Sequence, residues 1–509
     1  MPLFINPSIH PKAQWPFITR NMSLQPPLGI GFLAGYLRKK MDVPIRVIDE
    51  CIQTLDDATL TRELDSLDKP RIVCLSSMTL QIGRTMDLAK KIKGYAPDTT
   101  VIIGGVHPTV MPHEPFERGN VDIVVRREGE EVLAQLCERI YAGKDYRDVR
   151  GISYVGDNGT IIDNPDQPIV DLKTVPLFPF DLFEKNIAQY NAFGSLCTSR
   201  GCPYNCIFCS NRNVTGNLFR HFPIKWVEES LDILIHKYKQ DYIMFVDDVM
   251  FVDKKHFFAV ADMILRRGFH KKASFQGGAR ADTITPEIVA KSKEANFSFF
   301  GVGVETSSER LLKVLDKKET AVQIKKAIDL ITEQGMMTSG AFIYGIPTET
   351  REERKQSLEY ALALPIDNAR FNNIVPYPGT ALYEMAKREN KLVVKKDYYN
   401  FNVQYYLFGN DIPYVPEGSN RFEIIFDTMW ANLRYYFRPR TFQRFKKYKT
   451  TGGGTIHIPA NKRMSLYWDM ARFGFLVFVR FIYVGSIVFG IRLRQALTNK
   501  TTPGATAGQ

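Results

Sequence analysis

The sequence predicts an α/β protein with two successive parallel sheets and a helical C-terminal region. Apolar, β-branched runs alternate with helix-like segments over the first 150 residues, and a second series of this kind begins at Gly194. Between the two series lie an Asn-Gly turn signal and four prolines in seventeen residues, which are typical of a hairpin and a linker. After about residue 400 the alternation stops. We therefore expect domains at 1–150 and 191–400, a hairpin and linker at 151–190, and helices at 401–509.

The first series contains strand-like runs that are continuously apolar, as is typical of a doubly wound parallel sheet covered by helices on both faces. These runs are Pro2–Asn6, Ile45–Asp49, Arg71–Leu75, Thr100–Ile103 and Val121–Val125. In such a fold, ligands bind at the carboxyl ends of the strands. Gly104 and Gly105 follow the fourth run, where missing side chains let the backbone approach a bulky ligand. A tight turn would favour the same two residues.

The second series alternates strands and helices six times, which fits a full or partial α/β barrel. The strand candidates are Ser195–Thr198, Tyr242–Val246, Ala273–Gln276, Phe299–Val304, Thr338–Ile343 and Ala369–Val375. In barrels the chemistry gathers on loops at the carboxyl ends of the strands. The loop after the first strand reads RGCPYNCIFCS and holds Cys202, Cys206 and Cys209.

The composition limits what this cysteine group can be. With 44% hydrophobic and 24% charged residues the chain is of the ordinary globular type, and seven cysteines in 509 residues are too few for a disulfide framework. The N-terminal segment has no basic start followed by an apolar run, so we expect no secretory signal and a reducing, cytoplasmic location. Closely spaced cysteines in that setting are typical of metal-binding or catalytic sites.

Two kinds of metal centre are compatible with three cysteines at this spacing. Structural zinc takes four ligands, and His221, twelve residues after Cys209, is a candidate for the fourth. A cubane iron–sulfur cluster also normally takes four thiolates. Three thiolates leave one iron with an open position that can bind a substrate directly. Cys197 lies in a strand-like run and is expected to be packed, so the spacing favours the open cluster.

The CxxxCxxC motif after the first strand of the predicted barrel resembles the radical S-adenosylmethionine (SAM) superfamily, and Phe208 before the third cysteine fits the same pattern. The resemblance implies a partial (β/α)6 barrel and a [4Fe–4S] cluster held by the three cysteines. It also implies that the unique iron binds SAM. An electron delivered by a flavodoxin- or ferredoxin-type reductant would then cleave SAM to a 5′-deoxyadenosyl radical.

Further residues of the second series match, in order, positions that contact SAM in this superfamily. The resemblance implies that Asp247 and Asp248 contact the SAM amino group and that Arg280 contacts its carboxylate. It implies contacts to the ribose for Glu305 and Ser307, and contacts to the adenine for Gly340, Gly345 and Glu349. Asn372 and Asn373 match the sixth strand of the family and the loop that follows it. Structural alternatives remain open for several of them. The two aspartates could be surface acids, Arg280 could form a structural ion pair, and Glu305 with Ser307 could belong to a helix cap.

The N-terminal domain resembles the cobalamin-binding module that is fused to many such enzymes. The stretches PPLGIGFLAGYL (26–37), GGVHPTVMP (104–112) and DIVVRREGEEVL (122–133) carry the resemblance, and His107 is a candidate contact. Cobalamin mutases have Asp-x-His-x-x-Gly after the first strand, whereas this chain reads NPSIHPKAQ there. The resemblance therefore implies cobalamin whose cobalt has no protein ligand from below.

The C-terminal region is a separate clue. Between Arg434 and Arg494 the chain has nine Arg, four Lys and one acidic residue, which together account for the whole net charge of +12. Within it, Phe473–Ile491 is nineteen residues long with one charge, Arg480. A mid-helix Arg is costly in a bilayer, so an interfacial helix fits better than a spanning one. We expect 434–494 to associate with a membrane surface. Packing on the barrel and RNA binding are the less favoured alternatives.

Taken together, these features predict a cobalamin-dependent radical SAM enzyme that methylates an unactivated carbon of a lipid-like or otherwise hydrophobic small molecule. We expect it in the cytoplasm, peripheral at the inner face of the membrane. One alternative is a radical cyclase or oxidase without methyl transfer, of the porphyrin-ester cyclase type. Another is a non-catalytic iron–sulfur binding or sensor protein.

Overall fold

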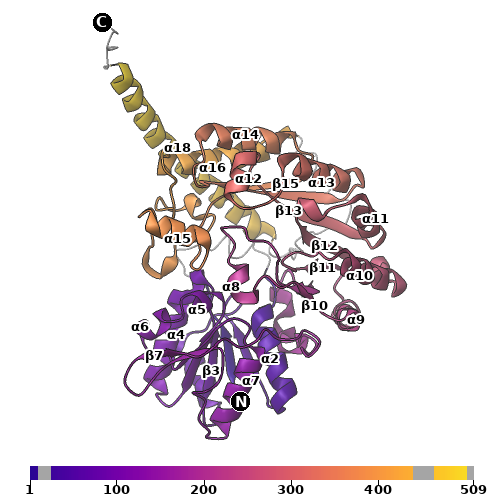
Figure 1. The fold of residues 1–509 in the computed structure, drawn as a ribbon, viewed down its shortest axis with the longest axis vertical. Coiled ribbons are helices and arrows are strands. Elements are labelled where there is room, and N and C mark those ends of the chain that lie inside the picture. Colours follow the sequence, from indigo (N-terminus) through magenta and orange to yellow (C-terminus); the bar gives the residue numbers. More distant parts are fainter. Residues whose placement is uncertain (10–23, 440–462, 501–509) are drawn as a thin grey trace.

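The computed structural model describes residues 1–9, 24–439 and 463–500. Two α/β units lie one above the other along the long axis, and the last helix runs along the outside (Figure 1). The fold class predicted from the sequence is confirmed in all three parts: a doubly wound sheet, an open barrel and a C-terminal helical region.

The first sheet has seven strands in the order β2-β1-β3-β4-β5-β6-β7. Its parallel strands are β1 (Leu3–Asn6), β2 (Arg46–Asp49), β3 (Ile72–Ser76), β4 (Thr100–Gly104) and β5 (Ile123–Val125). The expected hairpin is formed by β6 (Ile152–Val155) and β7 (Ile161–Asp163), which extend this sheet with two antiparallel strands. The strand order reverses between β1 and β3, and this is where such sheets bind ligands.

Helices cover both faces of this sheet, because successive strand residues point to opposite sides. They are α2 (Leu28–Met41), α3 (Asp57–Asp65), α4 (Ile82–Tyr95), α5 (Val106–Val110), α6 (Glu114–Arg118) and α7 (Glu130–Tyr141). Phe4 and Cys74 pack with α2 and α7 in one core cluster. Their neighbours Leu3, Ile5 and Val73 pack with α3 and α4 in another.

The second sheet has six parallel strands in the order β15-β14-β13-β12-β11-β8. They are β8 (Ser195–Leu196), β11 (Tyr242–Phe245), β12 (Ser274–Ala279), β13 (Phe297–Glu305), β14 (Met337–Tyr344) and β15 (Asn368–Asn373). β8 and β15 form the two edges of the sheet, so the barrel is partial. A short ribbon of β9 (Ser199–Arg200) and β10 (Arg220–His221) stands beside β8.

Most helices of the barrel, except the first two, begin after a residue whose side chain caps the helix. They are α8 (Asn211–Thr215), α9 (Ile224–Asp232), α10 (Lys254–Arg266), α11 (Pro286–Glu294), α12 (Glu309–Val314), α13 (Ala321–Glu333), α14 (Arg351–Ala363) and α15 (Ala381–Arg388). The side chains of Asp253, Thr285, Thr320, Thr350 and Thr380 each accept a hydrogen bond from a backbone N–H in the first turn of the helix that follows. Such caps stabilise a helix by about 1 kcal/mol each.

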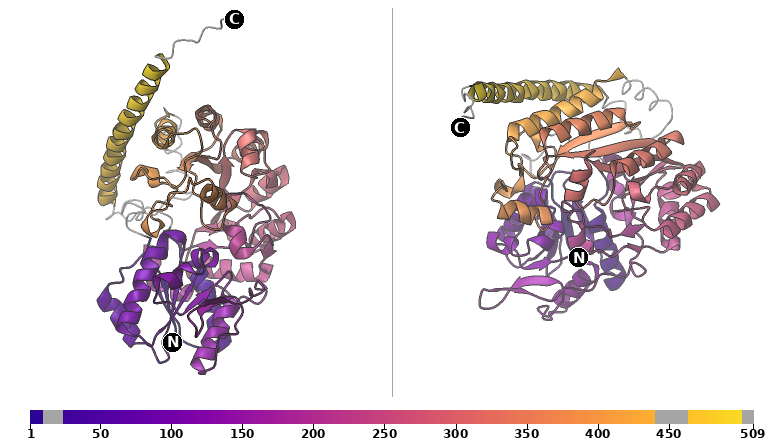
Figure 2. Two further views of the ribbon diagram at one scale, coloured as in Figure 1. Left: turned by 60° about the vertical axis from the view of Figure 1, so that its left-hand side comes forward. Right: turned by 45° about the horizontal axis from the view of Figure 1, so that its top comes forward.

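Two C-terminal helices, α16 (Arg421–Tyr436) and α18 (Arg463–Lys500), complete the described fold. α16 lies against β15, and α18 lies along the outside of α16 (Figure 2). Val484 and Val488 of α18 belong to the main core cluster, and the ring of Phe481 stacks on Phe426 at 5.0 Å. Within the described residues, one segment, Gly474–Gln495 of α18, is long and apolar enough to cross a membrane by length and composition alone.

Candidate functional site

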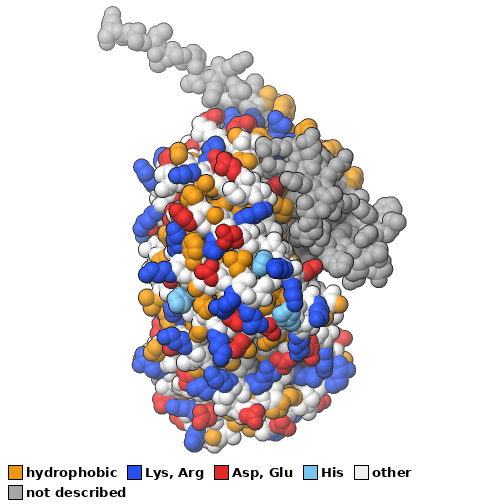
Figure 3. All heavy atoms as spheres, turned by 90° about the vertical axis from the view of Figure 1, so that its right-hand side faces the viewer, with side chains coloured by type: hydrophobic (Ala, Val, Ile, Leu, Met, Phe, Trp, Pro, Cys, Tyr) orange, Lys and Arg blue, Asp and Glu red, His pale blue; other side chains and the backbone are white. Residues whose placement is uncertain are grey.

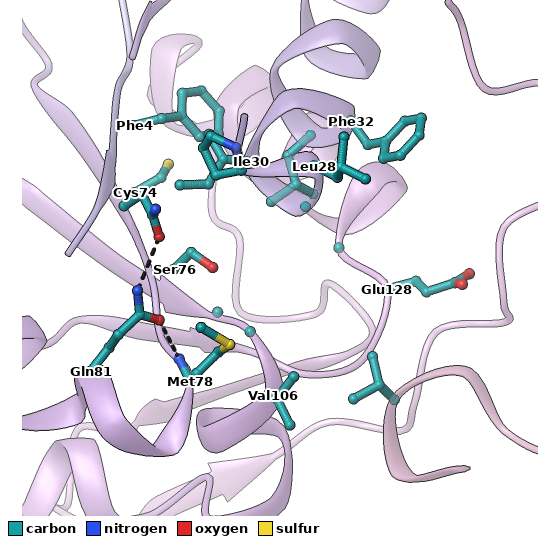
Figure 4. Close-up of a pocket in the computed structure, with 18 of the residues that line it drawn as sticks. Phe4, Leu28, Ile30, Phe32, Cys74, Ser76, Met78, Gln81, Val106 and Glu128 are labelled. Carbon is teal, nitrogen blue, oxygen red and sulfur yellow. Dashed lines mark hydrogen bonds between the residues drawn. The ribbon is translucent and has the colours of Figure 1, made fainter. Parts of the chain in front are cut away.

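A cavity of about 900 Å³ lies between the carboxyl edge of the first sheet and the start of the barrel. Figure 4 shows Phe4, Cys74, Ser76 and Met78 along one side, and Leu28, Ile30 and Phe32 of α2 along another. The barrel contributes Cys197, Ser199, Arg200, Val246 and Asp248 to the lining. Its walls are largely apolar, so the cavity suits a bulky ligand with few charges.

Gly104 and Gly105, the two glycines predicted at this edge, both line the cavity, but the surroundings that favour glycine differ between them. A Cβ on Gly104 would meet nothing closer than 3.6 Å. Gly105 has φ +106°, and a Cβ there would lie 2.7 Å from the carbonyl oxygen of Ser77. The turn explanation therefore accounts for Gly105, and the open-space explanation for Gly104. Gly29 on α2 also lines the cavity and has nothing within 4 Å of an added Cβ.

His107, a candidate cofactor contact, is placed elsewhere. Its ring is fully buried, with Nδ1 3.3 Å from Thr79 Oγ1 and Nε2 3.2 Å from Glu114 Oε2, and it packs edge-on against Tyr398. Burial opposes ionisation of Glu114, but the hydrogen bond and charge of His107 outweigh it and lower the pKa of Glu114 to about 2. His107 is thus held by its partners outside the cavity, and no histidine of the described residues lines the cavity. Residues 10–14 of the divergent NPSIHPKAQ stretch lie outside the described residues.

The three motif cysteines lie on the loop between β9 and α8, and all three are free thiols. The backbone around Ile207 anchors the loop: its N–H donates to Leu315 and its carbonyl accepts from Leu382. Phe208 packs with the same small core cluster, so its role in the structure is to hold the loop. Burial raises the pKa of Cys202, Cys206 and Cys209, and the cation of Arg280 opposes that rise at Cys202 and Cys206.

The donor set of the loop consists of three thiols, Cys202, Cys206 and Cys209. A four-iron cluster takes its thiolates on separate irons, so three thiolates fit such a cluster with one iron left open. His221, the candidate fourth zinc ligand, stacks on His256 at 4.5 Å and has its Nε2 3.9 Å from Asp253. Cys197 is buried in the cavity wall.

Asp247 and Asp248, adjacent in sequence, have different surroundings. The buried carboxylate of Asp247 accepts hydrogen bonds from the Thr198 N–H at 3.0 Å, from Thr198 Oγ1 at 2.8 Å and from Ser199 Oγ. Burial raises the pKa of Asp247 to about 6 against these hydrogen bonds. Asp248 is exposed, lines the cavity and accepts only from the N–H of Gly201, at 2.9 Å, among the described residues. Of the two, Asp248 is the one that can accept from a ligand.

A buried group of charges lies beside the cysteine loop. Arg280 holds Asp282 through two contacts of 3.2 Å, lies over the Tyr204 ring at 3.5 Å and has Nη1 3.8 Å from Cys206 Sγ. Glu305, in the left-handed region at φ +63°, is paired at 2.9 Å with Lys317. Burial opposes the charge of Lys317, but Glu305 and Glu319 raise its pKa to about 12. The predicted residues Arg280 and Glu305 therefore meet here, already engaged with neighbours.

Most of the remaining predicted positions lie at or just beyond the ends of β13, β14 and β15, whereas Gly340 lies in the middle of β14. Ser307 donates its N–H to Ser357 Oγ, and Gly345, at φ +84°, donates its N–H to Glu349 at 2.6 Å. Asn373 donates to Thr428, while its buried Oδ1 has no hydrogen-bond partner among the described residues. An unpaired buried acceptor is costly, and a bound ligand with donor groups would satisfy it.

Sequence reasoning missed residues whose role depends on distant partners. Lys317 is one of these, and Arg200 is another. Arg200 Nη1 lies 2.7 Å from Glu130 of α7, and Arg220 Nη2 lies 2.6 Å from Glu128. These pairs tie the first unit to β9, which enters the cysteine loop, and to its partner strand β10. The signal in the sequence for the last two pairs is the pair of acidic residues Glu128 and Glu130 after β5.

Comparison with known families agrees with this geometry. The model of the radical SAM superfamily matches residues 196–361, and that of the B12 binding domain matches residues 22–137. An uncharacterized methyltransferase of Pyrococcus horikoshii is 32% identical over 372 residues, which cover 72% of this chain and 80% of that protein. The anaerobic magnesium-protoporphyrin IX monomethyl ester cyclase of Rubrivivax gelatinosus is 26% identical over 87% of this chain and 78% of its own length. The hopanoid C-3 methylase of Methylococcus capsulatus is 26% identical over 77% and 74%, respectively.

Among solved structures, the cobalamin-dependent SAM radical enzyme OxsB with aqua-cobalamin bound has the same fold, with a TM-score of 0.71 at 20% identity. The similarity covers 88% of this chain and 71% of that one. The cofactors are accordingly a [4Fe–4S] cluster, SAM and cobalamin. The chain belongs to the radical SAM superfamily, as a methyltransferase-type enzyme with an N-terminal B12 binding domain.

Proposed function

We propose that this enzyme transfers a methyl group to an unactivated carbon of a hydrophobic, lipid-like small molecule. One observation carries the proposal: a single, largely apolar cavity is lined both by the carboxyl edge of the B12 binding domain and by residues just before the cysteine loop. A methyl donor in that cavity and a substrate beside the loop would lie close together. The name of the hopanoid C-3 methylase adds support for a lipid-like substrate.

The cavity has the character that cobalamin requires. Its walls are apolar, Gly104 and Gly29 leave room at the wall, and no described histidine lines it. We therefore propose binding without a protein imidazole on cobalt. When bound, cobalamin and SAM at the cluster supply a methyl group and the one-electron chemistry that removes a hydrogen atom from carbon.

The residues of the barrel hold and orient these groups in the proposal. Cys202, Cys206 and Cys209 are the cluster ligands, and Asp248 accepts from the SAM ammonium group. Asp247 positions the strand before the loop by gathering the N–H of Thr198 and the hydroxyl groups of Thr198 and Ser199. The cations of Arg280 and Lys317 lie beside the thiols and favour an anionic ligand there.

The rest of the SAM pocket is proposed at the ends of β13 to β15. Glu305 and Ser307 lie where the ribose is expected, and Gly345 presents backbone beside the expected adenine. The unpaired Oδ1 of Asn373 is a further acceptor for SAM. A flavodoxin- or ferredoxin-type protein would deliver the electron. We place the enzyme on the cytoplasmic side, peripheral at the membrane, where a lipid-like substrate is found.

A second candidate is a radical cyclisation or oxidation without methyl transfer. The observation in its favour is the extent of the similarity to the porphyrin-ester cyclase, which covers 87% of this chain. The two reactions differ in their SAM products. Methylation consumes one SAM as methyl donor and another as radical source, so S-adenosylhomocysteine accompanies 5′-deoxyadenosine. The cyclase reaction forms only the latter.

The test uses the full chain, reconstituted anaerobically with iron, sulfide and hydroxocobalamin. It is incubated with SAM, a low-potential reductant and a lipid extract from a strain that lacks the gene. We expect both SAM products and one extract component heavier by a methyl group, with a CD3 label transferred from labelled SAM. Turnover of the extract component with 5′-deoxyadenosine alone would overturn methylation in favour of the cyclase-type reaction.

A further inference from the structure

We propose that α18 docks the enzyme on an anionic membrane as a helix lying in the plane of the surface, with one face on the protein and the opposite face in the lipid. The proposal deepens the proposed function, since it names the surface from which a hydrophobic substrate would come. It rests on the contacts of α18 and not on the chemistry of the cofactor site.

The inward face of α18 is firmly attached to the body. Val484 and Val488 are buried, and Phe481 stacks on Phe426 of α16. Arg492 reaches Glu423 of α16 at 3.4 Å. The attachment extends over three helical turns, so the helix is part of the folded enzyme.

Arg480, the one charge within Phe473–Ile491, is turned toward the protein. Its Nε donates to the carbonyl of Tyr406 at 3.1 Å, and its Nη2 donates to the carbonyl of Gly409 at 2.6 Å and to Asn410 Oδ1 at 2.9 Å. A spanning orientation would break these hydrogen bonds and expose the guanidinium to hydrocarbon, which is expensive. In the plane of the surface, every one of them is kept. These hydrogen bonds keep the charge of Arg480 out of the hydrocarbon, so they favour a helix that lies in the plane of the membrane surface.

Between Phe475 and Leu493, the outward face of α18 carries a row of exposed apolar side chains. Its exposed side chains include Phe475, Phe478, Val479, Ile482, Phe489 and Leu493. Trp430 of α16, which lies beside Phe481, extends the same hydrophobic surface and is also exposed. We call these seven side chains the apolar face. By contrast, the face of the body in Figure 3 shows Lys, Arg, Asp and Glu interspersed, with hydrophobic side chains scattered among them.

The charge of the region identifies the occupant as an anionic surface. The segment from Arg434 to Arg494 carries 13 basic residues and one acidic residue. Arg472 and Arg494 are exposed near the two ends of the apolar face. Aromatic side chains flanked by Arg and Lys are typical of helices in the headgroup region. A second copy of this chain would bring the same positive charge to the interface and be repelled.

The experiment measures cosedimentation of the full-length enzyme with vesicles of phosphatidylcholine alone and with about one third phosphatidylglycerol. We expect binding to the anionic vesicles that high salt weakens only partly, because screening removes the charge contribution and leaves the apolar one. The double variant Phe478→Asp/Phe489→Asp should bind at least tenfold more weakly at every salt concentration. Val322→Asp, at an equally exposed apolar position on α13, is the matched control and should bind like the wild type.

Two outcomes would overturn the proposal: wild-type enzyme that does not bind anionic vesicles, or a double variant that binds as well as Val322→Asp. A lipid-free dimer that the double variant converts to a monomer would assign the apolar face to a second copy instead. Iron content and SAM cleavage of the double variant should stay at wild-type levels. That readout separates failure of docking from failure of the proposed function.

Discussion

The carboxyl edges of the two sheets carry the two parts of the proposed cofactor site, and their surroundings differ. At the first edge, glycines and apolar side chains surround open space. At the second edge, Asp247, Arg280, Glu305 and Lys317 are buried and paired with protein groups. In the proposed function, the first edge selects by shape and the second by charge that is already organised, which suits a large macrocycle and a small ligand with charged groups, respectively.

The largest expected effect concerns the cysteine loop, because a cluster that loses one of three thiolates leaves an iron uncovered. Cys202→Ala, Cys206→Ala or Cys209→Ala should each abolish the cluster, whereas the wild type should contain about four irons per chain. Iron analysis and the broad visible absorbance measure this. Cys51→Ala and Cys74→Ala, whose thiols belong to the first unit, should keep the iron. A zinc-containing, colourless wild type would contradict the assignment.

The next effect tests selection by shape at the first edge. Gly29→Leu places a side chain into the cavity without meeting any atom within 4 Å of its Cβ, and it should reduce hydroxocobalamin loading at least tenfold without changing the iron content. Gly94→Leu, in α4 and equally open, is the control and should load normally. Gly105→Leu is less informative, since the positive φ and the contact with Ser77 would strain the backbone. Normal loading of Gly29→Leu would show that the ligand lies elsewhere.

A third prediction distinguishes the neighbouring acids of the second edge. Asp248→Asn keeps an acceptor for the Gly201 N–H but loses the charge, so it should weaken SAM binding about tenfold with little change in stability. In Asp247→Asn, the amide can accept fewer of the hydrogen bonds that Thr198 and Ser199 donate to the carboxylate, so this variant should lower the free energy of unfolding by about 1–3 kcal/mol. Isothermal titration with SAM and urea unfolding measure the two quantities. Equal effects of the two variants on both would contradict the division of roles.

The smallest effect is a pH dependence of stability that originates at Glu349. Burial raises the pKa of this carboxyl to about 8 from its ordinary 4.5, although Arg354 and the Gly345 N–H lower it. Because the folded state holds the proton more tightly, the contribution to stability is full below about pH 4.5 and is lost as the pH rises to 8. Glu349→Gln should flatten the change in urea midpoint between pH 5.5 and pH 8, while Glu352→Gln, at an exposed position in the first turn of α14, should leave it unchanged. An unaltered slope in Glu349→Gln would exclude this residue as its source.

The sequence was most informative about features that are determined by the spacing of nearby residues. The three-two spacing of the cysteines and the alternation of strands and helices depend on neighbours within a few residues. The N-caps that begin the barrel helices are equally local. For this reason the fold class, the cysteine loop and one edge of the cavity could all be predicted.

The sequence could not distinguish the environments of adjacent side chains or predict contacts between distant ones. Asp247 and Asp248 look alike in sequence, but consecutive residues at a strand end point in opposite directions, so one is buried and the other faces the cavity. His107 follows the glycine pair, yet the short helix α5 turns it toward Glu114 and Tyr398. Lys317 gains its role from Glu305 and Glu319, a pairing that the left-handed backbone at Glu305 helps to bring about.

The C-terminal region shows the same division. The sequence by itself determined that a largely apolar stretch of nineteen residues, one of them Arg, forms a helix beside a strongly basic segment, because composition and length are properties of the chain alone. Only the tertiary structure decided which way Arg480 points and which face of α18 stays exposed. Those choices depend on carbonyl groups at Tyr406 and Gly409, more than 70 residues earlier in the chain, which the fold brings within hydrogen-bonding distance.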